Sequence, residues 1–390
     1  MLIWHRAEEY SRNAELSDGW TSFHLVDLKG LCVKRQYVVS ALVMLTACNP
    51  SGDPKKSETK PSVAEPADRV SLTKFVEVED RAPLTPIVQE QMLVQVMLDR
   101  AGFSPGVIDG KGGQTFKLAI SGFQTANDLD PSGSLDVATR DALSRLPKVS
   151  ATRLVRIPAE FARQSFMPDL PGDPVAQARL PNLGYRNLME ALAERFHTTT
   201  GTLVALNPPE TLVGVNRVIR VPNIAEVPDA PSTIDQRGWN KTLQSLAVDA
   251  SQAEAAKVVV DKSQGVLKVF DKSGHLIAQF PATMGSRHDP LPLGKWKIQG
   301  VSRNPDFHYN PKLFWDVSDR KEAVLLKPGA NGPVGVAWLD LSKPHYGIHG
   351  TSEPQTIGRS ESHGCVRLTN WDAARLAQMV KSGIPAIFQS

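Results

Sequence analysis

The strongest constraint on the fold is a run of short apolar segments and tight turns that begins near residue 256. Polar turns lie at Lys262–Gly265 and Asp271–Gly274, with apolar segments before, between and after them. Short segments of β-branched and aromatic residues separated by such turns are typical of antiparallel strands. One helix is expected late in the chain, capped by Thr369 or Asn370. We therefore predict a mainly β domain over residues 256–390.

Residues 83–148 show a different pattern, with apolar residues at helical spacing. An amphipathic segment begins at Ile87, and the glycine turn Gly106–Gly110 separates it from a second apolar segment, Phe116–Phe123. Asp136 is placed to begin a third short helix. The pattern predicts a module of three helices.

Residues 183–224 combine two short helical segments with a closing strand at Val218–Pro222, which predicts a small α+β module. The proline-rich residues 151–182 are interpreted as a connection with some extended structure, and the polar residues 225–255 as a linker. The whole chain is thus predicted to be a multidomain α+β protein.

A secretory signal is predicted near the N-terminus. Lys34 and Arg35 precede an apolar stretch that ends in Leu45-Thr46-Ala47-Cys48. A basic start, a short apolar stretch and small residues at the cleavage site are typical of such signals. The last four residues resemble a bacterial lipobox, and lipidation of Cys48 would anchor the protein to a membrane from outside. The alternative is a buried strand that happens to end in cysteine.

The predicted signal also determines how the residues before and after it are interpreted. Residues 1–33 precede it, so we expect translation to begin downstream of Met1, for example at Val33 read from a GTG codon. Residues 49–80 are rich in Pro, Ser, Lys and Glu, a composition that cannot bury a core, and are predicted to be a flexible tether.

Composition excludes several classes of protein. The chain carries 44 Lys and Arg against 41 Asp and Glu, a net charge of +3, without the basic excess or cluster of a nucleic-acid-binding protein. No apolar run reaches the ~20 residues that a membrane-spanning helix needs. Nothing in the sequence requires a cofactor, and the oligomeric state stays open.

Candidate catalytic residues lie near the C-terminus. In the exported chain Cys365 would have no partner for a disulfide, so its thiol is either reactive or inertly buried. A cysteine attacks as thiolate and needs a base, a role suited to His349 and His363, which both neighbour glycine. Gly364 leaves room beside the thiol for a substrate backbone. Arg367, two residues along a strand, would share the face of Cys365 and could hold a carboxylate.

The stretch from about Lys257 to Gln389 resembles the L,D-transpeptidase catalytic domain, also called the YkuD domain. The matching segments are Pro290–Gly294, Pro333–Gly335 with Trp338, Ile348–Thr351, Ile357-Gly358 and Ser362–Leu368. The resemblance implies a β-sandwich-like sheet assembly with Cys365 as nucleophile. It implies that His349 is the general base and that the backbone carbonyl of Gly350 orients it. Substrate placement would fall to Ser362, His363, Gly364 and Arg367.

Residues 83–148 resemble the peptidoglycan-binding-1 family. The matching residues are Ala101–Phe103, Val107–Gly110, Phe123-Gln124 and Gly133–Asp136 with Thr139. Lys111–Gly113 stands where the family often has an aromatic residue, which leaves binding competence open. A generic helical bundle is the alternative.

Residues 183–224 are similar to a degenerate LysM domain, through Leu203–Asn207 and the final Val221-Pro222. Arg186-Asn187 replaces the usual turn before the first helix. An unrelated α+β linker module is the alternative.

The resemblance to L,D-transpeptidases implies two acyl transfers on peptidoglycan. Cys365 would attack a stem tetrapeptide, release the terminal D-Ala and keep the acyl group as a thioester. An amine of a neighbouring stem would then give a 3→3 cross-link. Water would give carboxypeptidation, and a protein amine would attach that protein to the wall.

Three other interpretations stay open. A zinc site of His345, His349, His363 and Cys365 is disfavoured because glycines and a proline interrupt any helix there. A non-catalytic wall-binding lipoprotein is disfavoured by the intact Cys365, His349 and Arg367. The aromatic segment 303–320 is either a rim over the cleft or core filling.

The predicted protein is periplasmic or bound to the cell envelope by a lipid anchor. Asn49, rather than Asp, follows the lipobox, which favours the outer membrane. The predicted order is an N-terminal extension (1–33), a lipoprotein signal (34–48), a tether (49–80), a peptidoglycan-binding-like module (83–148), a connection (151–182), a LysM-like module (183–224), a linker (225–255) and a catalytic domain (256–390).

Overall fold

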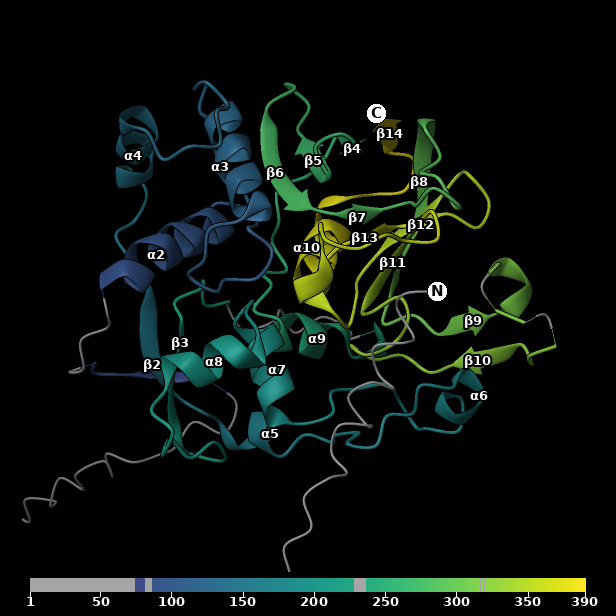
Figure 1. Ribbon diagram of the computed structural model, residues 1–390, viewed down its shortest axis with the longest axis horizontal. Helices are drawn as coiled ribbons and strands as arrows, with labels where there is room; N and C mark the ends of the chain where they lie inside the picture. Colours follow the sequence, from purple (N-terminus) through teal and green to yellow (C-terminus); the bar gives the residue numbers. More distant parts are fainter. Residues whose placement is uncertain (1–73, 81–85, 228–235, 316, 319) are drawn as a thin grey trace, which may run out of the picture. The chain divides into compact units, whose positions relative to one another are not determined.

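A computed structural model describes residues 74–80, 86–227, 236–315, 317–318 and 320–390 (Figure 1). All described residues belong to one compact unit, Val70–Ser390. The expected signal, Cys48 and residues 1–33 therefore lie outside the described residues, as does most of the expected tether. Within the described part, no helix has both the length and the apolar character to span a bilayer.

The three predicted helices of the first module are present. They are α2 (Pro86–Arg100), α3 (Gln114–Ala126) and α4 (Val137–Ser144). The Asp136 side chain caps α4 by accepting a hydrogen bond from the Thr139 backbone N–H at 2.8 Å. Their apolar faces form one core, which includes Val94, Leu98, Phe116, Ile120, Phe123 and Leu143.

A three-stranded antiparallel sheet supports the second module. Its order is β1 (Val76–Val78), β2 (Thr152–Arg156) and β3 (Val218–Pro222). The structure differs from the sequence interpretation at β1, which falls in the expected tether, whereas β2 falls in the connection for which some extended structure was expected. Strands of three to five residues carry too little alternation to be told from extended linkers. Helices α5 (Ala159–Ala162), α6 (Pro174–Gln177), α7 (Leu188–Arg195) and α8 (Thr200–Leu206) lie between β2 and β3 in the chain.

The mainly β domain is built on a nine-stranded sheet of order β6-β5-β4-β14-β8-β11-β12-β13-β7 (Figure 1). The predicted meander is confirmed as β4, β5 and β6. Neighbours pair antiparallel except β14 with β4 and β12 with β13, which are parallel. The bounds are β4 Lys257–Asp261, β5 Val266–Phe270, β6 Leu276–Pro281, β7 Thr283–Met284, β8 Gly294–Arg303, β11 Ala337–Leu341, β12 Gly347–His349, β13 Val366–Arg367 and β14 Pro385–Gln389.

The late helix, α10 (Asn370–Met379), packs against β11 and β12. Thr369 caps it, accepting a hydrogen bond from the Asp372 backbone N–H at 3.1 Å. The helix ends before Gly383, which instead takes a positive φ of 93° in the turn to β14. A separate hairpin joins β9 (Phe307–Tyr309) to β10 (Val324–Leu326), with η2 (Pro311–Leu313) and η3 (Pro354–Thr356) in loops.

The expected linker 225–255 also differs from the prediction. Its second half carries η1 (Gln236–Gly238) and α9 (Trp239–Ser245). Trp239, Leu243 and Leu246 are buried in the core of the mainly β domain. The average composition is polar, but these few apolar side chains supply one buried helical face.

A buried ion pair joins the first module to the mainly β domain. Asp99 at the end of α2 contacts both terminal nitrogens of Arg375 on α10, at 3.0 and 2.9 Å. His197, which follows α7, places Nδ1 3.0 Å from Asp99 and stacks on Trp371 with ring centroids 5.0 Å apart. Burial alone would raise the pKa of Asp99, but Arg375 and His197 hold it well below its usual range. The three modules of the described unit therefore meet at one buried point.

Candidate active site

Two parallel strands bring the predicted catalytic residues to one face of the sheet. In the register of β12 and β13, Ile348 lies opposite Val366 and His349 opposite Arg367. Because side chains alternate along a strand, Cys365, just before β13, shares a face with Arg367 and His349. Ile348 and Val366 point the other way and are fully buried, which fixes the register.

The indole of Trp338 forms one wall of this face. Trp338 pairs with His349 across β11 and β12, and the two rings stack with centroids 5.6 Å apart. A Cβ at Gly347 would overlap the indole, so only glycine fits below it. The backbone N–H of Gly347 hydrogen-bonds to Cys365, whose Sγ lies 3.9 Å from the carbonyl oxygen of His345.

The imidazole of His349 is held as a base. Its Nδ1 lies 2.7 Å from the carbonyl oxygen of Gly350, the residue predicted to orient it. A carbonyl only accepts hydrogen bonds, so Nδ1 carries the proton of the neutral ring and Nε2 keeps its lone pair. Burial, followed by the positive charge of Arg367, lowers the pKa of His349 to about 4, although the Gly350 carbonyl opposes this.

We expect the ring protons of His349 to titrate near pH 4 in an NMR experiment on the folded protein. Since the pKa of His349 is depressed, neutral His349 favours the folded state above pH 6.5, and this contribution is lost as the pH falls toward 4. Titration of His349 near 6.5 would contradict the buried, Arg367-facing environment.

The thiol and the imidazole are both neutral at rest. Burial raises the pKa of Cys365, and the Gly347 N–H and Arg367 only partly offset this. Burial also lowers the pKa of Arg367, which the Cys365 and Glu353 charges oppose. With a thiol that holds its proton and a histidine of low pKa, attack by sulfur has to be coupled to proton transfer to the ring.

Ser362 and Gly364 shape the loop that carries the thiol. Ser362 donates a hydrogen bond to the carbonyl oxygen of Cys365 at 2.6 Å and accepts one from the Gly285 N–H at 2.6 Å. Ser362 was expected to contact substrate, but these two bonds tie it to the loop backbone. Gly364 has a φ of 89°, and a Cβ there would lie 2.7 Å from the ring of Tyr346.

We expect Gly364→Ala to lower the free energy of unfolding by about 1–3 kcal/mol, because alanine rarely adopts this φ. The same change should slow alkylation of Cys365 by iodoacetamide, since the loop must move away from Tyr346. Thermal melts and peptide mass spectrometry measure the two effects. Gly274→Ala is the matched control, because Gly274 also has positive φ but has nothing within 4 Å of its Cβ position. Equal alkylation rates in both variants would contradict the crowding at Gly364.

Aromatic rings surround His363. The Phe314 ring lies edge-on at 5.4 Å, and Trp315 lies at 6.4 Å and stacks on His288 at 4.1 Å. Tyr309 is buried beside Leu326, whereas Trp315 is 54% exposed at the site.

The sequence analysis did not single out two neighbours of the site, Tyr346 and His288, whereas Trp338 is one of the residues that carry the resemblance. Tyr346 lies against Gly364, His288 against Trp315, and the Trp338 indole covers His349. Trp338 belongs to a strand with clearly alternating residues, and that alternation predicts which face of the sheet its side chain is on. His288 and Tyr346 lie in loops, where spacing predicts no contact.

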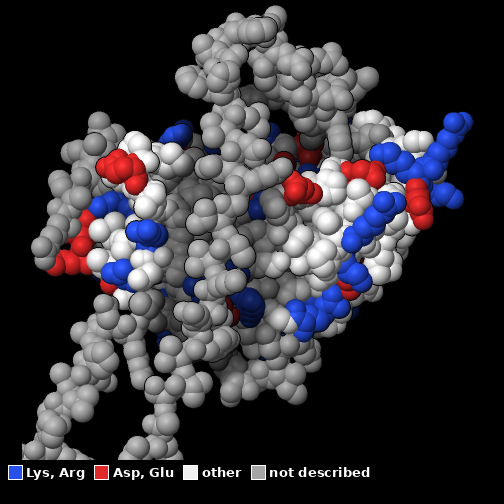
Figure 2. All heavy atoms as spheres, turned by 90° about the horizontal axis from the view of Figure 1, so that it is seen from below, with Lys and Arg blue, Asp and Glu red and all other residues white. Residues whose placement is uncertain are grey.

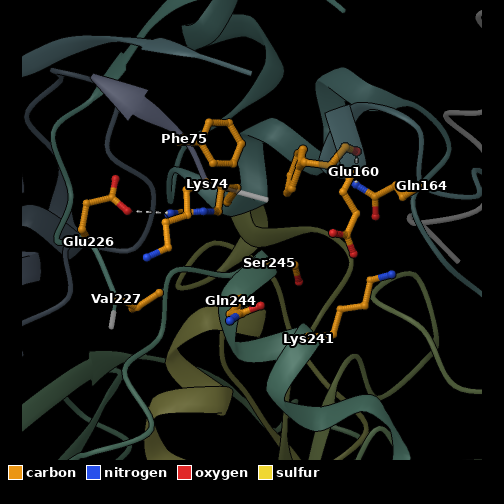
Figure 3. Close-up of a pocket in the computed structure, with 11 residues that line it drawn as sticks. Lys74, Phe75, Glu160, Gln164, Glu226, Val227, Lys241, Gln244 and Ser245 are labelled. Atoms are coloured by element: carbon orange, nitrogen blue, oxygen red, sulfur yellow. Dashed lines mark hydrogen bonds and ion pairs between the residues drawn. The ribbon is translucent and has the colours of Figure 1, made fainter. Parts of the chain in front are cut away.

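A cavity lies away from these residues. It has a volume of about 320 Å³ and lies between the residues before β1, α5, α7 and α9, with Glu160, Lys241 and Ser245 among its lining (Figure 3). None of its lining residues is cysteine or histidine.

On the face of the molecule in Figure 2, basic and acidic side chains are interspersed. Within the described residues no group of three or more His, Cys, Asp or Glu is placed to hold a metal ion.

A thiol beside glycine, a neutral imidazole oriented by a carbonyl and a half-buried arginine lie on one sheet face, and these are the groups that cysteine-dependent acyl transfer requires. Residues 255–387 match the family model of the YkuD L,D-transpeptidase catalytic domain. Residues 89–143 match that of a putative peptidoglycan binding domain. The chain thus contains an L,D-transpeptidase catalytic domain and a peptidoglycan-binding domain, as predicted.

Curated relatives carry the same name. The chain is 29% identical over 197 residues to a putative L,D-transpeptidase YkuD of Bacillus licheniformis, covering 50% of this chain and 89% of the relative. It is 54% identical over 111 residues to that of Bacillus subtilis, covering 28% and 52%. This chain therefore spans only about half the length of the second relative.

Solved structures with some similarity include L,D-transpeptidase 3 from Mycobacterium tuberculosis in complex with a faropenem-derived adduct. Identity is 18%, coverage is 45% of this chain and 75% of that chain, and the TM-score is 0.30. The NMR structure of the catalytic domain of the E. faecium L,D-transpeptidase is 17% identical, with coverage of 35% and 99% and a TM-score of 0.26.

Proposed function

We propose that this protein is a cysteine L,D-transpeptidase of the cell wall. The observation that carries the proposal is the His349 ring, held by the Gly350 carbonyl with Nε2 available, on the same sheet face as Cys365. Support comes from the match of residues 255–387 to the transpeptidase family. The peptidoglycan-binding domain supports peptidoglycan as the substrate and the cell envelope as the location.

In the first transfer, Cys365 Sγ attacks the carbonyl carbon between an L-centre and the terminal D-Ala of a stem tetrapeptide. The thiol proton passes to Nε2 of His349, and backbone N–H groups near Cys365 hold the oxyanion. The C–N bond then breaks, His349 returns the proton to the leaving amine, and D-Ala departs. Arg367, on the same face, holds a substrate carboxylate.

In the second transfer, an amine attacks the thioester and gives up a proton to His349. The C–S bond breaks, and the sulfur takes the proton back. With a stem-peptide amine the product is a 3→3 cross-link, with a protein amine it is a wall-attached protein, and with water it is a shortened peptide. We favour the stem amine, because the domain matches are to transpeptidases.

The anchoring proposal rests on the sequence alone. The lipobox-like segment ending at Cys48 supports a lipid anchor, and Asn49 supports the outer membrane. The order of β2, α7, α8 and β3 is compatible with a LysM-like module, whose glycan binding we propose on the resemblance of residues 183–224.

The test is mass spectrometry of the full chain incubated with a disaccharide-tetrapeptide. We expect release of D-Ala, a thioester mass on the peptide that contains Cys365, and a cross-linked dimer when a second stem is present. Only the shortened tripeptide in the presence of acceptor would favour the carboxypeptidase. No adduct and no D-Ala, with wall binding intact, would favour the non-catalytic lipoprotein.

A further inference from the structure

One buried amide contacts both structures that hold the imidazole of His349. Asn370, the first residue of α10, is fully buried, and a Cβ on either Gly335 or Gly350 would overlap its Oδ1. The same Oδ1 accepts a hydrogen bond from the Val336 N–H at 3.2 Å. Asn370 therefore packs on the residue whose carbonyl orients His349.

The second structure is β11. Val336 immediately precedes this strand, which carries Trp338, the ring stacked on His349. The amide of Asn370 thus fixes the start of β11 and the Gly350 peptide at once. A rotation of this amide would exchange its oxygen for an NH₂ group, which cannot accept the Val336 N–H.

One of the two groups that accept hydrogen bonds from the Asn370 NH₂ group comes from outside the catalytic domain. Nδ2 of Asn370 donates to the carbonyl oxygen of Ala330 at 3.1 Å and to Glu194 Oε2 at 3.0 Å. Glu194 lies on α7, before residue 255, and is 4% exposed. None of the ion pairs among the described residues includes it. Burial raises the pKa of Glu194 to about 8, while Asn370 and Tyr185 oppose this by hydrogen bonding.

The surrounding surfaces keep Glu194 in place. The backbone N–H of Leu183 donates to the carbonyl oxygen of Pro328 at 3.0 Å, and that of Asn331 donates to the carbonyl oxygen of Leu183 at 2.8 Å. The side chain of Asn331 also donates to Glu190 at 3.2 Å. The loop 328–336 of the catalytic domain is thus hydrogen-bonded to residues 183–190.

We propose that Glu194 is a positioning residue for the transpeptidase reaction, acting from the LysM-like module through Asn370 and Gly350 on His349. The inference rests on the proposed function, because it assigns His349 the role of base. The carboxyl group of Glu194 contacts neither the thiol of Cys365 nor the ring of His349. It holds the amide that packs against the Gly350 peptide, and a small displacement of an oriented base reduces turnover far more than it reduces binding.

The test compares three variants of the full chain. Glu194→Leu leaves the Asn370 amide with the Ala330 carbonyl as its one remaining acceptor among those named, and should lower kcat for D-Ala release about 10- to 100-fold, with KM within about two-fold. Glu194→Gln keeps an oxygen that accepts from Asn370 and should stay within about three-fold of wild type. Glu190→Leu is the matched control, because Glu190 lies on the same helix and contacts Asn331 but not Asn370. It should also stay within about three-fold.

A readout without substrate separates this inference from the proposed function. The pH profile of Cys365 alkylation by iodoacetamide reports the sulfur and its base, and in Glu194→Leu it should shift to higher pH. If wild type releases no D-Ala, the proposed function fails while the alkylation comparison still tests the link. A folded Glu194→Leu with wild-type kcat and an unshifted profile would overturn the inference. The inference would also be overturned if Glu190→Leu lost as much kcat as Glu194→Leu, or if the unfolded fraction of Glu194→Leu accounted for its whole loss of kcat.

If Glu194→Leu does not fold, Glu194→Asp serves instead. This change moves the carboxyl group one methylene away from Asn370. It should lower kcat several-fold and shift the pH profile of Cys365 alkylation to higher pH. Wild-type kcat and profile in Glu194→Asp would overturn the inference.

Discussion

Cys365→Ala is expected to reduce D-Ala release by about 10⁴-fold or more, because the variant has no nucleophile to accept the acyl group. Backbone donors and the base at His349 would remain, but no thioester can form on alanine. Release of D-Ala from a disaccharide-tetrapeptide and the mass of the peptide containing residue 365 measure the effect. Thermal melts should change little, because alanine fits the space that the thiol leaves.

Cys365→Ser provides the comparison. A hydroxyl is harder to ionise than a thiol, so a histidine with a pKa of about 4 is too weak a base for it. We expect serine to be nearly as inactive as alanine although it keeps the shape of cysteine. D-Ala release by Cys365→Ala within ten-fold of wild type would refute catalysis by this sulfur.

Arg375→Ala is expected to lower the free energy of unfolding by about 3–5 kcal/mol, because it leaves the carboxylate of Asp99 buried with one partner fewer. Asp99 is 0% exposed and the side chain of Arg375 is 10% exposed. Urea unfolding at neutral pH measures the change. Because the pKa of Asp99 is lowered, the stabilisation by this pair is complete above pH 3.8 and is lost as the pH falls through the lower folded-state pKa.

The control for this variant lies in the same helical module. Arg140 and Glu90 form an ion pair with side chains 52% and 59% exposed, so Arg140→Ala should cost less than about 1 kcal/mol. The double variant Asp99→Leu with Arg375→Leu removes both charges and should be more stable than Arg375→Ala alone. Equal stability of Arg375→Ala and wild type would show that the modules are not joined by this pair.

The elements that the sequence predicted well have long or sharply bounded patterns. The meander β4 to β6 is confirmed because two glycine turns bound it, and α4 is confirmed because Asp136 caps it. The motif around Cys365 predicted a strand there, with Arg367 on the same face as Cys365, and β13 is that strand. Turns, helix caps and strand alternation depend on residues that are close in sequence, so a short stretch of sequence is enough to predict them.

The unpredicted features depend on partners far apart in the chain. Strand β1 exists because it pairs with β2, and α9 is buried because Trp239 reaches the core of the catalytic domain. Asn370 was predicted as a possible helix cap, but its contacts with Glu194 and Gly350 join residues that are far apart in sequence. The periodicity of the sequence does not predict such contacts. Taken alone, an asparagine at the start of a helix and a glutamate near the end of one are ordinary residues at helix termini.

The buried Asp99–Arg375 pair, together with the Ser104 hydroxyl that donates to Asp372 at 2.7 Å, holds α2 to α4 against the catalytic domain. The distance from these helices to Cys365 is therefore fixed. If α2 to α4 bind one glycan strand, the sulfur can meet only those stem peptides that lie at one set spacing and angle from the bound strand. The spacing of stems in the wall, rather than their chemistry alone, would then decide which of them react.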